Sequence, residues 1–397
     1  MAGIERKGSI DDLCPACKRN GRVFCPHSSS LFVKAEVETK LSENMAGPSP
    51  PNMFIGTYGY PNISAGPMIS IGASVDDPAK MYGMEYQEII RQRSNMVIGR
   101  QAQSIFSRTR KLGELQDAIM STKDVDMEAV FREKPRLSLS MDNILQPMGP
   151  TAALKDFSVI GNPAVPRVVD QIRNDNILAV DALSELTGKG FDSHYLTKLL
   201  SAGILGRREQ KKMVPTRWAI TATDDMVGKQ MLEKVRLLPQ AEEFMVFSTE
   251  YLFNHFEVIV LPGAFEFEQF EAWMGADPKY ASISEEYEGF EGRTAYAFTQ
   301  GGGYYACRFG VAWGLLNALK MQGRVTVIRE ILPDYTIPVG VWEVRENARH
   351  AMMKKPFRFD NLKAALDNAF TRLKVPRLRY LEKTRILRQS KISDFLR

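Results

Sequence analysis

The alternation of strand-like and helical segments between residues 243 and 332 constrains the fold most. Residues 243–251 and 255–261 are rich in aromatic and β-branched side chains, and Pro262 and Gly263 follow as a turn signal. Three glycines at 301–303 precede a helical run over 304–321, and 324–332 again has the composition of a strand. This order predicts an α+β protein with a mixed α/β body.

The rest of the chain divides by composition into further segments. Residues 46–67 hold five prolines and four glycines, which predicts a linker or rigid loop. Apolar residues recur at helical spacing over 82–120 and 168–208. We therefore expect four parts. They are an N-terminal zinc-binding segment (1–45), a loop and mainly helical part (46–212), an α/β part with a candidate ligand site (213–370) and a basic tail, helical at its end, with a docking peptide (371–397).

Composition excludes several classes of protein. The chain is 44% hydrophobic and 25% charged, close to soluble globular averages, which excludes a disordered or fibrous chain. No apolar run approaches the roughly 18 residues that cross a bilayer, so we expect no membrane role. The first twelve residues lack the apolar core of a secretion signal, and four cysteines in 397 residues do not form a disulfide framework. We expect a cytoplasmic protein.

Charge is distributed unevenly along the chain. Residues 371–397 carry nine Lys or Arg against two acidic residues, whereas 241–293 carry twelve acidic residues against two basic ones. The net charge of +5 therefore comes from the C-terminal end, and the body is not a uniformly basic nucleic-acid binder. The acidic segment should repel phosphate.

Four potential zinc ligands lie within fourteen residues near the N-terminus: Cys14, Cys17, Cys25 and His27. A C-x-x-C turn directs two thiolates at one ion, and Gly21 allows the chain to reverse and return the second pair. The C-x-H spacing of that pair is tighter than in common zinc fingers. A redox C-x-x-C, or unconnected cysteines, is the alternative to a structural zinc site.

The last nine residues have the pattern of a short peptide ligand. In a single helical turn Ile392, Phe395 and Leu396 would form one apolar face, with Gln389 at its edge. The pattern resembles the motif by which replication and repair proteins dock on the sliding clamp, proliferating cell nuclear antigen, with Leu396 where a second aromatic residue is more common. The alternative is a helix end folded back on its own domain.

Several blocks of sequence carry a family resemblance. They are GTYGYPNISAGP, MVPTRWAITATDD, GGGYYACRFG and PVGVWEVREN. Together with the N-terminal Cys/His segment and the C-terminal peptide, they resemble the Nre family of archaeal DNA-repair proteins over nearly the whole chain. The resemblance implies a cytoplasmic protein that repairs damaged DNA together with the sliding clamp, with the four Cys/His positions as zinc ligands. It implies no established reaction.

A phosphate site is predicted in the 213–370 part. Gly302 and Gly303 open a helix, where backbone amides can bind an anion, and Tyr304 and Arg308 lie one turn apart. The other candidates are cationic, polar or aromatic side chains: Arg217, Trp218, Arg345, Asn347 and Arg349. The expected ligand is DNA or a nucleotide. Alternatively, the glycines allow tight helix packing and the arginines pair with the acidic 241–293 segment.

A catalytic alternative uses carboxylates. Asp224 and Asp225, with His350, could serve a metal-assisted phosphodiesterase or nuclease holding Mg or Mn. Equally, a helix starting near Thr221 would make these aspartates capping residues. Glutamates alternate with phenylalanines over 265–271, which predicts a half-buried strand rather than a metal site. The primary hypothesis is a clamp-recruited repair factor, and a non-catalytic clamp adaptor is a third possibility.

Overall fold

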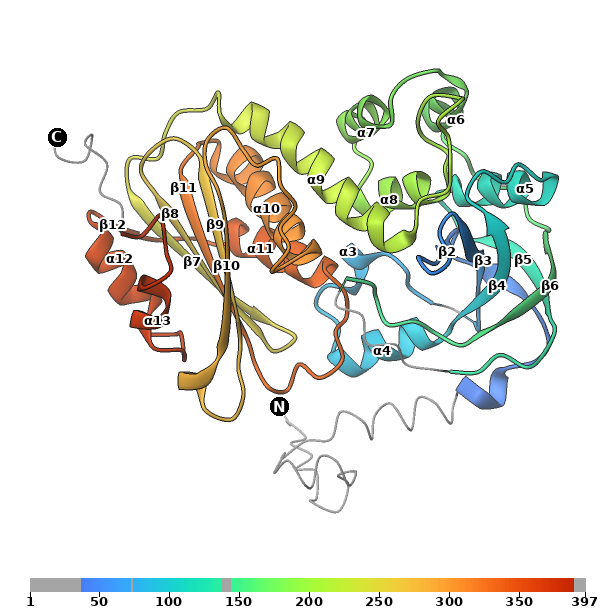
Figure 1. Ribbon diagram of the computed structural model, residues 1–397, viewed down its shortest axis with the longest axis horizontal. Helices are drawn as coiled ribbons and strands as arrows, with labels where there is room; N and C mark the ends of the chain where they lie inside the picture. The colour runs from blue at the N-terminus through green and yellow to red at the C-terminus, as the bar shows by residue number, and fades with distance from the viewer. Residues whose placement is uncertain (1–36, 73, 138–143, 389–397) are drawn as a thin grey trace, which may run out of the picture. The chain divides into compact units, whose positions relative to one another are not determined.

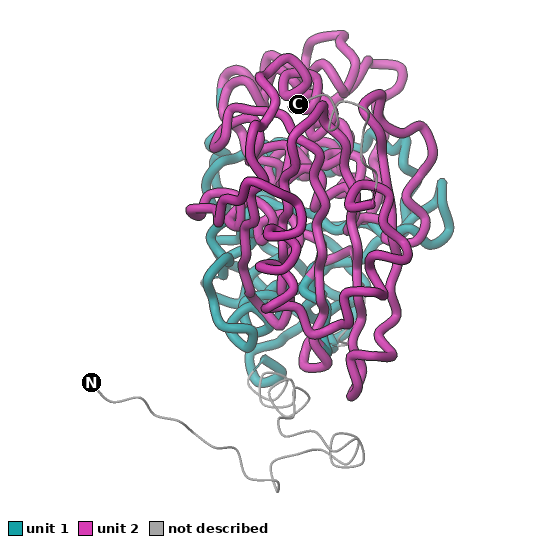
Figure 2. The backbone as a smooth tube through the Cα atoms, turned by 90° about the vertical axis from the view of Figure 1, so that its left-hand side faces the viewer, with its two compact units in different colours: residues 1–142, 146–166, 336–339 teal, residues 143–145, 167–335, 340–397 magenta. Residues whose placement is uncertain are grey.

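The computed structural model describes residues 37–72, 74–137 and 144–388. These residues form two compact units (Figure 2). Unit 1 takes the described residues up to 166, except 144 and 145, together with 336–339. Unit 2 takes 144, 145, 167–335 and 340 onward. Each unit contains one mixed sheet and several helices, which confirms the α+β class. Among the described helices, none is long and apolar enough to cross a membrane.

Unit 1 is built on a six-stranded sheet with the order β1-β5-β6-β4-β3-β2. Its elements are β1 (Asn44–Ser49), β2 (Met53–Ile55), β3 (Asn62–Ser70), α3 (Pro78–Met81), α4 (Tyr86–Ser94), β4 (Met96–Ser104), α5 (Arg110–Ile119), β5 (Val125–Phe131) and β6 (Thr151–Val159). Only the β4–β6 pair is parallel among these strands. The boundary between the units, at residues 166 and 167, lies inside the predicted 46–212 segment.

The expected linker at 46–67 is wrong, because this segment contributes to three strands. β1 and β2 are the two edges of the sheet, where the missing N–H of a proline costs no ladder hydrogen bond. β3 is paired on both sides, but its register with β4 skips Gly66 and Pro67. Pro67 therefore lies at the break in that ladder.

The helical pattern expected over 82–120 is confirmed at its two ends and is wrong in the middle. The segment forms α4, then β4, then α5. Met96, Val97 and Ile98 are all fully buried, as in a strand covered on both faces. In so short an apolar run, the spacing of the side chains does not distinguish a buried strand from a turn of a buried helix.

Unit 2 begins with four helices and continues into a second six-stranded sheet. The helices are α6 (Arg167–Asn174), α7 (Ala179–Gly188), α8 (Ser193–Ser201) and α9 (Thr216–Val235). The strands are β7 (Phe244–Tyr251), β8 (Asn254–Leu261), β9 (Glu266–Trp273), β10 (Ser282–Glu288), β11 (Arg324–Ile331) and β12 (Phe357–Phe359). Their order is β10-β9-β11-β8-β7-β12, and β9 and β11 run parallel. The helical pattern over 168–208 and the strands expected over 243–251, 255–261 and 324–332 are confirmed.

Helices cover both faces of this sheet. α9, α10 (Gly302–Trp313) and α11 (Trp342–Met353) lie on one side (Figure 1), and α12 (Leu362–Ala369) and α13 (Arg377–Leu381) lie on the other. α10 runs on into a π-helical turn (Gly314–Leu319), which confirms the helical run over 304–321, and a 3-10 turn (Pro278–Tyr280) precedes β10. The strand expected over 265–271 is confirmed as β9, but it is not half-buried, since both of its faces are buried through Ala272.

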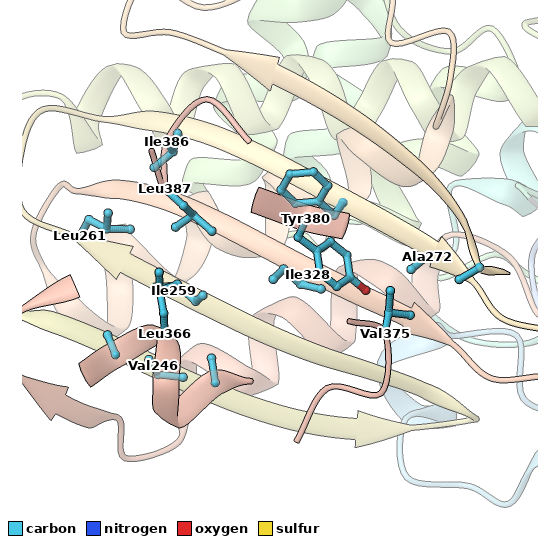
Figure 3. Close-up of a cluster of buried hydrophobic side chains, with 14 of the residues drawn as sticks. Val246, Ile259, Leu261, Ala272, Ile328, Leu366, Val375, Tyr380, Ile386 and Leu387 are labelled. Atoms are coloured by element: carbon cyan, nitrogen blue, oxygen red, sulfur yellow. The ribbon is translucent and has the colours of Figure 1, made fainter. Parts of the chain in front are cut away.

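The C-terminal segment packs on the second face of the sheet as far as residue 388. Val375, Tyr380, Ile386 and Leu387 join the apolar core there (Figure 3). The carboxylate of Glu330 accepts the backbone N–H groups of residues 374 and 375, each at 2.8 Å, and the Tyr380 hydroxyl at 3.0 Å. The first part of the predicted basic tail is thus an integral part of unit 2.

Candidate functional site

The predicted site residues of the 213–370 part lie on three helices that pack on one face of the unit 2 sheet. They are Arg217, Trp218, Asp224 and Asp225 on α9, Gly302, Gly303, Tyr304 and Arg308 on α10, and Arg345, Asn347, Arg349 and His350 on α11. α9 begins at Thr216 after Pro215, so the helix start expected near Thr221 is wrong. Asp224 and Asp225 lie inside α9 and are not its caps.

Glycines let α10 approach its neighbours closely. A Cβ on Gly303 would lie 2.7 Å from Glu271 Oε1, so only glycine allows the start of α10 to meet that carboxylate of β9. A Cβ on Gly310 would lie 2.6 Å from the carbonyl oxygen of Arg345, where α10 crosses α11. The N-terminal end of α10 therefore already faces a carboxylate of the protein itself.

Arg308 joins α10 to α9 and to β10 and is almost completely buried. Its guanidinium donates to Glu288 Oε2 at 2.8 Å and also to the carboxylate of Asp225. The Tyr304 hydroxyl donates to the same Glu288 oxygen at 2.8 Å. Burial, reinforced by Glu288, raises the pKa of Tyr304 well above its usual range. For Arg308, burial lowers the pKa, but Glu288, Tyr304 and Asp225 together more than offset this, so Arg308 stays charged.

Arg345 makes the corresponding connection between α11 and α9. It donates to Asp224 Oδ1 at 2.6 Å, and Asp224 is fully buried. Burial raises the pKa of Asp224 despite the opposing effect of Arg345. On the same helix Glu346 pairs with Arg349, and its carbonyl oxygen lies 2.9 Å from His350 Nδ1.

Arg329 of β11 forms a third buried cluster that the sequence patterns did not predict. Its guanidinium donates to Glu271 at 2.8 Å, to Glu343 at 3.0 Å and to Asn254 at 2.9 Å. Asn347 donates to the other oxygen of Glu343. Burial raises the pKa of Glu343 to about 7, although Arg329 opposes the shift. The available signal was the adjacent pair of charged residues Arg329 and Glu330 within the strand 324–332.

An exposed surface, which we call the rim, lies beside these buried clusters. It consists of Arg217 and Trp218 at the start of α9 and of Tyr296 and Phe298 in the loop before α10. Trp218 is 45% exposed and Phe298 83% exposed. The rings of Tyr296 and Phe298 meet edge to face with centroids 5.3 Å apart. Burial raises the pKa of Tyr296, and the positive charge of Arg217 opposes the shift.

The remaining predicted sites are the zinc site, the docking peptide and the catalytic metal site. The residues Cys14, Cys17, Cys25 and His27, and the peptide residues Gln389, Ile392, Phe395 and Leu396, lie outside the described residues. Within the part of the chain that the structure describes, no group of three or more His, Cys, Asp or Glu side chains is placed to hold a metal ion. Among the described residues, no such group surrounds Asp224 and Asp225.

Comparison with known proteins identifies the family. Residues 20–277 match the family description "Archaeal Nre, N-terminal", and residues 288–396 match "Archaeal Nre, C-terminal". The chain belongs to the archaeal Nre family. This result confirms the resemblance found in the sequence. The gap between the two matched regions, residues 278–287, contains most of β10 and so lies inside one sheet of unit 2, not between the two structural units.

Relatives cover almost the whole chain. The chain is 35% identical over 395 residues to the DNA repair protein NreA of Archaeoglobus fulgidus, a match that spans 96% of this chain and 98% of the relative. It is 31% identical to NreB of the same organism, over 95% of this chain and 97% of the relative. NreA of Haloferax volcanii is 32% identical over 79% of each chain. No solved structure matches this Nre chain.

Proposed function

We propose that this Nre chain acts in DNA repair by binding DNA at the rim and by docking on the sliding clamp through its C-terminal peptide. The observation that carries the repair role is the match, over nearly the full length of both chains, to proteins named as DNA repair proteins. Two chains that share 35% identity over this length share their fold, so the role of the relative is the best hypothesis for this chain.

The rim has the chemistry of a surface that binds a DNA strand with unstacked bases. Its exposed rings are those of Trp218, Tyr296 and Phe298. Stacking of a base on such a ring contributes about 1–3 kcal/mol to the free energy of binding. Arg217 supplies a guanidinium for a phosphate or for stacking. The rim lies next to the start of α10, since the Tyr296 hydroxyl is 3.5 Å from the position a Cβ on Gly301 would occupy.

The buried arginines have a supporting role in this proposal. Arg308 of α10 and Arg345 of α11 are bonded to carboxylates of α9, α11 and β10, so they hold the three helices in register rather than present charge to a ligand. Arg308 pairs with Glu288 of the acidic 241–293 segment. This agrees with the alternative in which the arginines bind carboxylates of that segment instead of phosphate. These ion pairs fix α9, which carries Arg217 and Trp218, against α10, which follows the loop that carries Tyr296 and Phe298.

Removing rim aromatics should weaken DNA binding. We expect Trp218→Ala and Phe298→Ala each to reduce the affinity of the full chain for a fluorescein-labelled single-stranded oligonucleotide by about tenfold, because each removes one stacking surface. Fluorescence anisotropy measures this. The matched control is Tyr280→Ala, which removes an equally exposed ring (84%) from the 3-10 turn before β10 and should bind as wild type does. Unchanged affinity in both rim variants would refute the rim as the contact.

The N-terminal segment should bind one structural zinc ion. We expect elemental analysis of the purified protein to give about one zinc per chain, because two thiolates of a C-x-x-C turn, a third thiolate and an imidazole complete a tetrahedral set. The double change of Cys14 and Cys25 to Ala should remove the zinc, whereas Cys307→Ser, at a buried cysteine of α10, should retain it. A zinc-free wild-type protein would contradict the assignment.

A further inference from the structure

One carboxylate of β10 closes the loop that carries two of the aromatic residues of the rim. The loop runs from Arg293 to Thr299 between β10 and α10, and Tyr296 and Phe298 lie within it. Glu286 Oε2 accepts the Arg293 guanidinium at 2.8 Å, while Glu286 Oε1 accepts both the backbone N–H and the hydroxyl of Thr299, at 2.9 and 2.7 Å. The first and last residues of the loop are therefore bound to the same side chain.

Arg293 also holds the middle of the loop from inside. Its Nε donates to the carbonyl oxygen of Ala295 at 2.8 Å, and a second guanidinium nitrogen donates to the carbonyl oxygen of Tyr296 at 3.1 Å. The guanidinium lies over the Tyr304 ring of α10, 4.7 Å from its centroid. Because these partners all belong to the protein, Arg293 orders the loop and is not a phosphate contact.

Contacts with the start of α10 fix the loop from the other side. The backbone N–H of Ala297 donates to the Tyr305 hydroxyl at 3.1 Å, and the backbone N–H of Gly301 donates to the carbonyl oxygen of Ala297 at 2.7 Å. The Tyr296 ring lies against the Tyr305 ring, with centroids 5.5 Å apart. Ala297 is buried, although Tyr296 and Phe298 on either side of it are exposed. The two exposed rings are therefore carried by a backbone that is fixed on both sides.

Glu286 is charged in this arrangement. Burial raises its pKa, but the hydrogen bonds from Thr299 and Arg293 outweigh burial, so the pKa lies below its ordinary value. Only 12% of the Glu286 side chain and 14% of the Arg293 side chain are exposed, and both carboxylate oxygens already accept hydrogen bonds from the loop. Glu286 can therefore influence a ligand at the rim through the loop rather than by direct contact.

We propose that Glu286 is the positioning residue of the rim, which holds the 293–299 loop closed so that Tyr296 and Phe298 are in place before a DNA base arrives. A loop that is already ordered loses little conformational freedom on binding, so more of the stacking energy appears as affinity. When the loop opens, the apparent affinity falls with the fraction of molecules that remain closed. The identity of the ligand rests on the proposed function, whereas the closure of the loop does not.

The test compares the full chain carrying Glu286→Gln with wild type, in anisotropy titrations with a labelled single-stranded oligonucleotide. Glutamine has nearly the same size, but its amide has one acceptor oxygen and cannot accept from both Arg293 and Thr299. We expect the affinity to fall about tenfold, the result when about one molecule in ten keeps the loop closed. Loss of a negative charge alone would act in the opposite direction, because it reduces the repulsion of phosphate.

The matched control is Glu291→Gln. Glu291 is an exposed carboxylate just before the loop and takes no part in the bonds described above. Its replacement removes the same charge, so this variant should bind at least as tightly as wild type. An affinity of Glu286→Gln equal to or higher than that of wild type overturns the positioning role.

A combination of variants separates positioning from a general loss of structure. The double variant Tyr296→Ala, Phe298→Ala lacks both rings of the loop. Adding Glu286→Gln to it should lower the affinity no further, because Glu286 acts only through these rings. A further loss as large as that caused by Glu286→Gln in the wild-type chain would overturn the proposal.

Loop closure is measured without DNA by hydrogen-exchange mass spectrometry of the free chain. Glu286→Gln should speed exchange in peptides that cover 293–301 and leave peptides of α9 unchanged. Unchanged exchange of the loop overturns the closure. If Trp218→Ala and Phe298→Ala bind as wild type does, the rim fails and the positioning role fails with it, whatever the exchange of the loop. If those two variants bind weakly and Glu286→Gln does not, only the positioning role fails.

Discussion

Replacing Arg329 by methionine is expected to destabilise unit 2 by about 3–5 kcal/mol, the cost of leaving buried carboxylates without their partner. The guanidinium of Arg329 bonds Glu271 of β9 and Glu343 of α11 at 2.8 and 3.0 Å, and all three side chains are buried. Methionine fills a similar volume, so the loss reflects charge rather than a cavity. Urea unfolding followed by circular dichroism gives the free energy of unfolding of wild type and variant.

The control for this prediction is Arg358→Met in the same unit. Arg358 pairs with Glu243 at 3.0 Å, but both side chains are about half exposed, so the ion pair contributes roughly 0–1 kcal/mol. A further variant combines Arg329→Met with Glu271→Gln and Glu343→Gln, and it should recover part of the lost stability because no buried charge remains unpaired. A loss for Arg329→Met no larger than for Arg358→Met would contradict the role given to the cluster.

Ending the chain at Arg388 is expected to abolish co-elution with the sliding clamp. The proposed contact consists of Ile392, Phe395 and Leu396 with Gln389 at their edge, so the truncation removes every anchor at once. The cut must not come earlier, because Ile386 and Leu387 belong to the core of unit 2. Size-exclusion chromatography of the mixed proteins measures the interaction.

Two controls accompany the truncation. Ser390→Ala, which spares the anchors, should still co-elute with the clamp. The unfolding midpoint of the truncated chain should equal that of wild type, because the truncation keeps Ile386, Leu387 and the described contacts of Glu330 with the C-terminal segment. Persistent co-elution of the truncated chain would show that the clamp contact lies elsewhere or does not exist.

The elements of unit 2 were predictable because their signals are local. The strands over 243–261 are marked by aromatic and β-branched residues, and the helix from 304 is marked by the helical spacing of its apolar residues. Both signals lie within the segment itself and do not depend on its partners in the fold. In unit 1 the strands at 44–70 were not predictable from the local sequence, which is rich in proline. A strand tolerates proline at the edge of a sheet, and β1 and β2 are edges only because of the order in which distant strands pair. Pro215 was an available signal for the start of α9, which the Thr221 capping pattern obscured.

The candidate site was predictable only in part. Helical spacing correctly grouped Tyr304 with Arg308 and Arg345 with Arg349, each pair on one helix. Key partners of the buried charges come from far along the chain: Asp224 and Arg345 are 121 residues apart, and Glu271 and Arg329 are 58 apart. No local pattern encodes such pairs. The rim aromatics Tyr296 and Phe298 were missed because an aromatic residue in a loop has no period.

The central claim is that this Nre chain binds single-stranded DNA, and its most direct test is a titration of the wild-type full chain with a labelled single-stranded oligonucleotide at several salt concentrations. Because binding to phosphates releases counterions, the logarithm of the association constant should fall linearly with the logarithm of salt concentration. Trp218→Ala should shift that line down by about tenfold without changing its slope. Absence of binding by wild type even at about 50 mM salt would contradict the account and favour an adaptor that only joins the clamp to another protein.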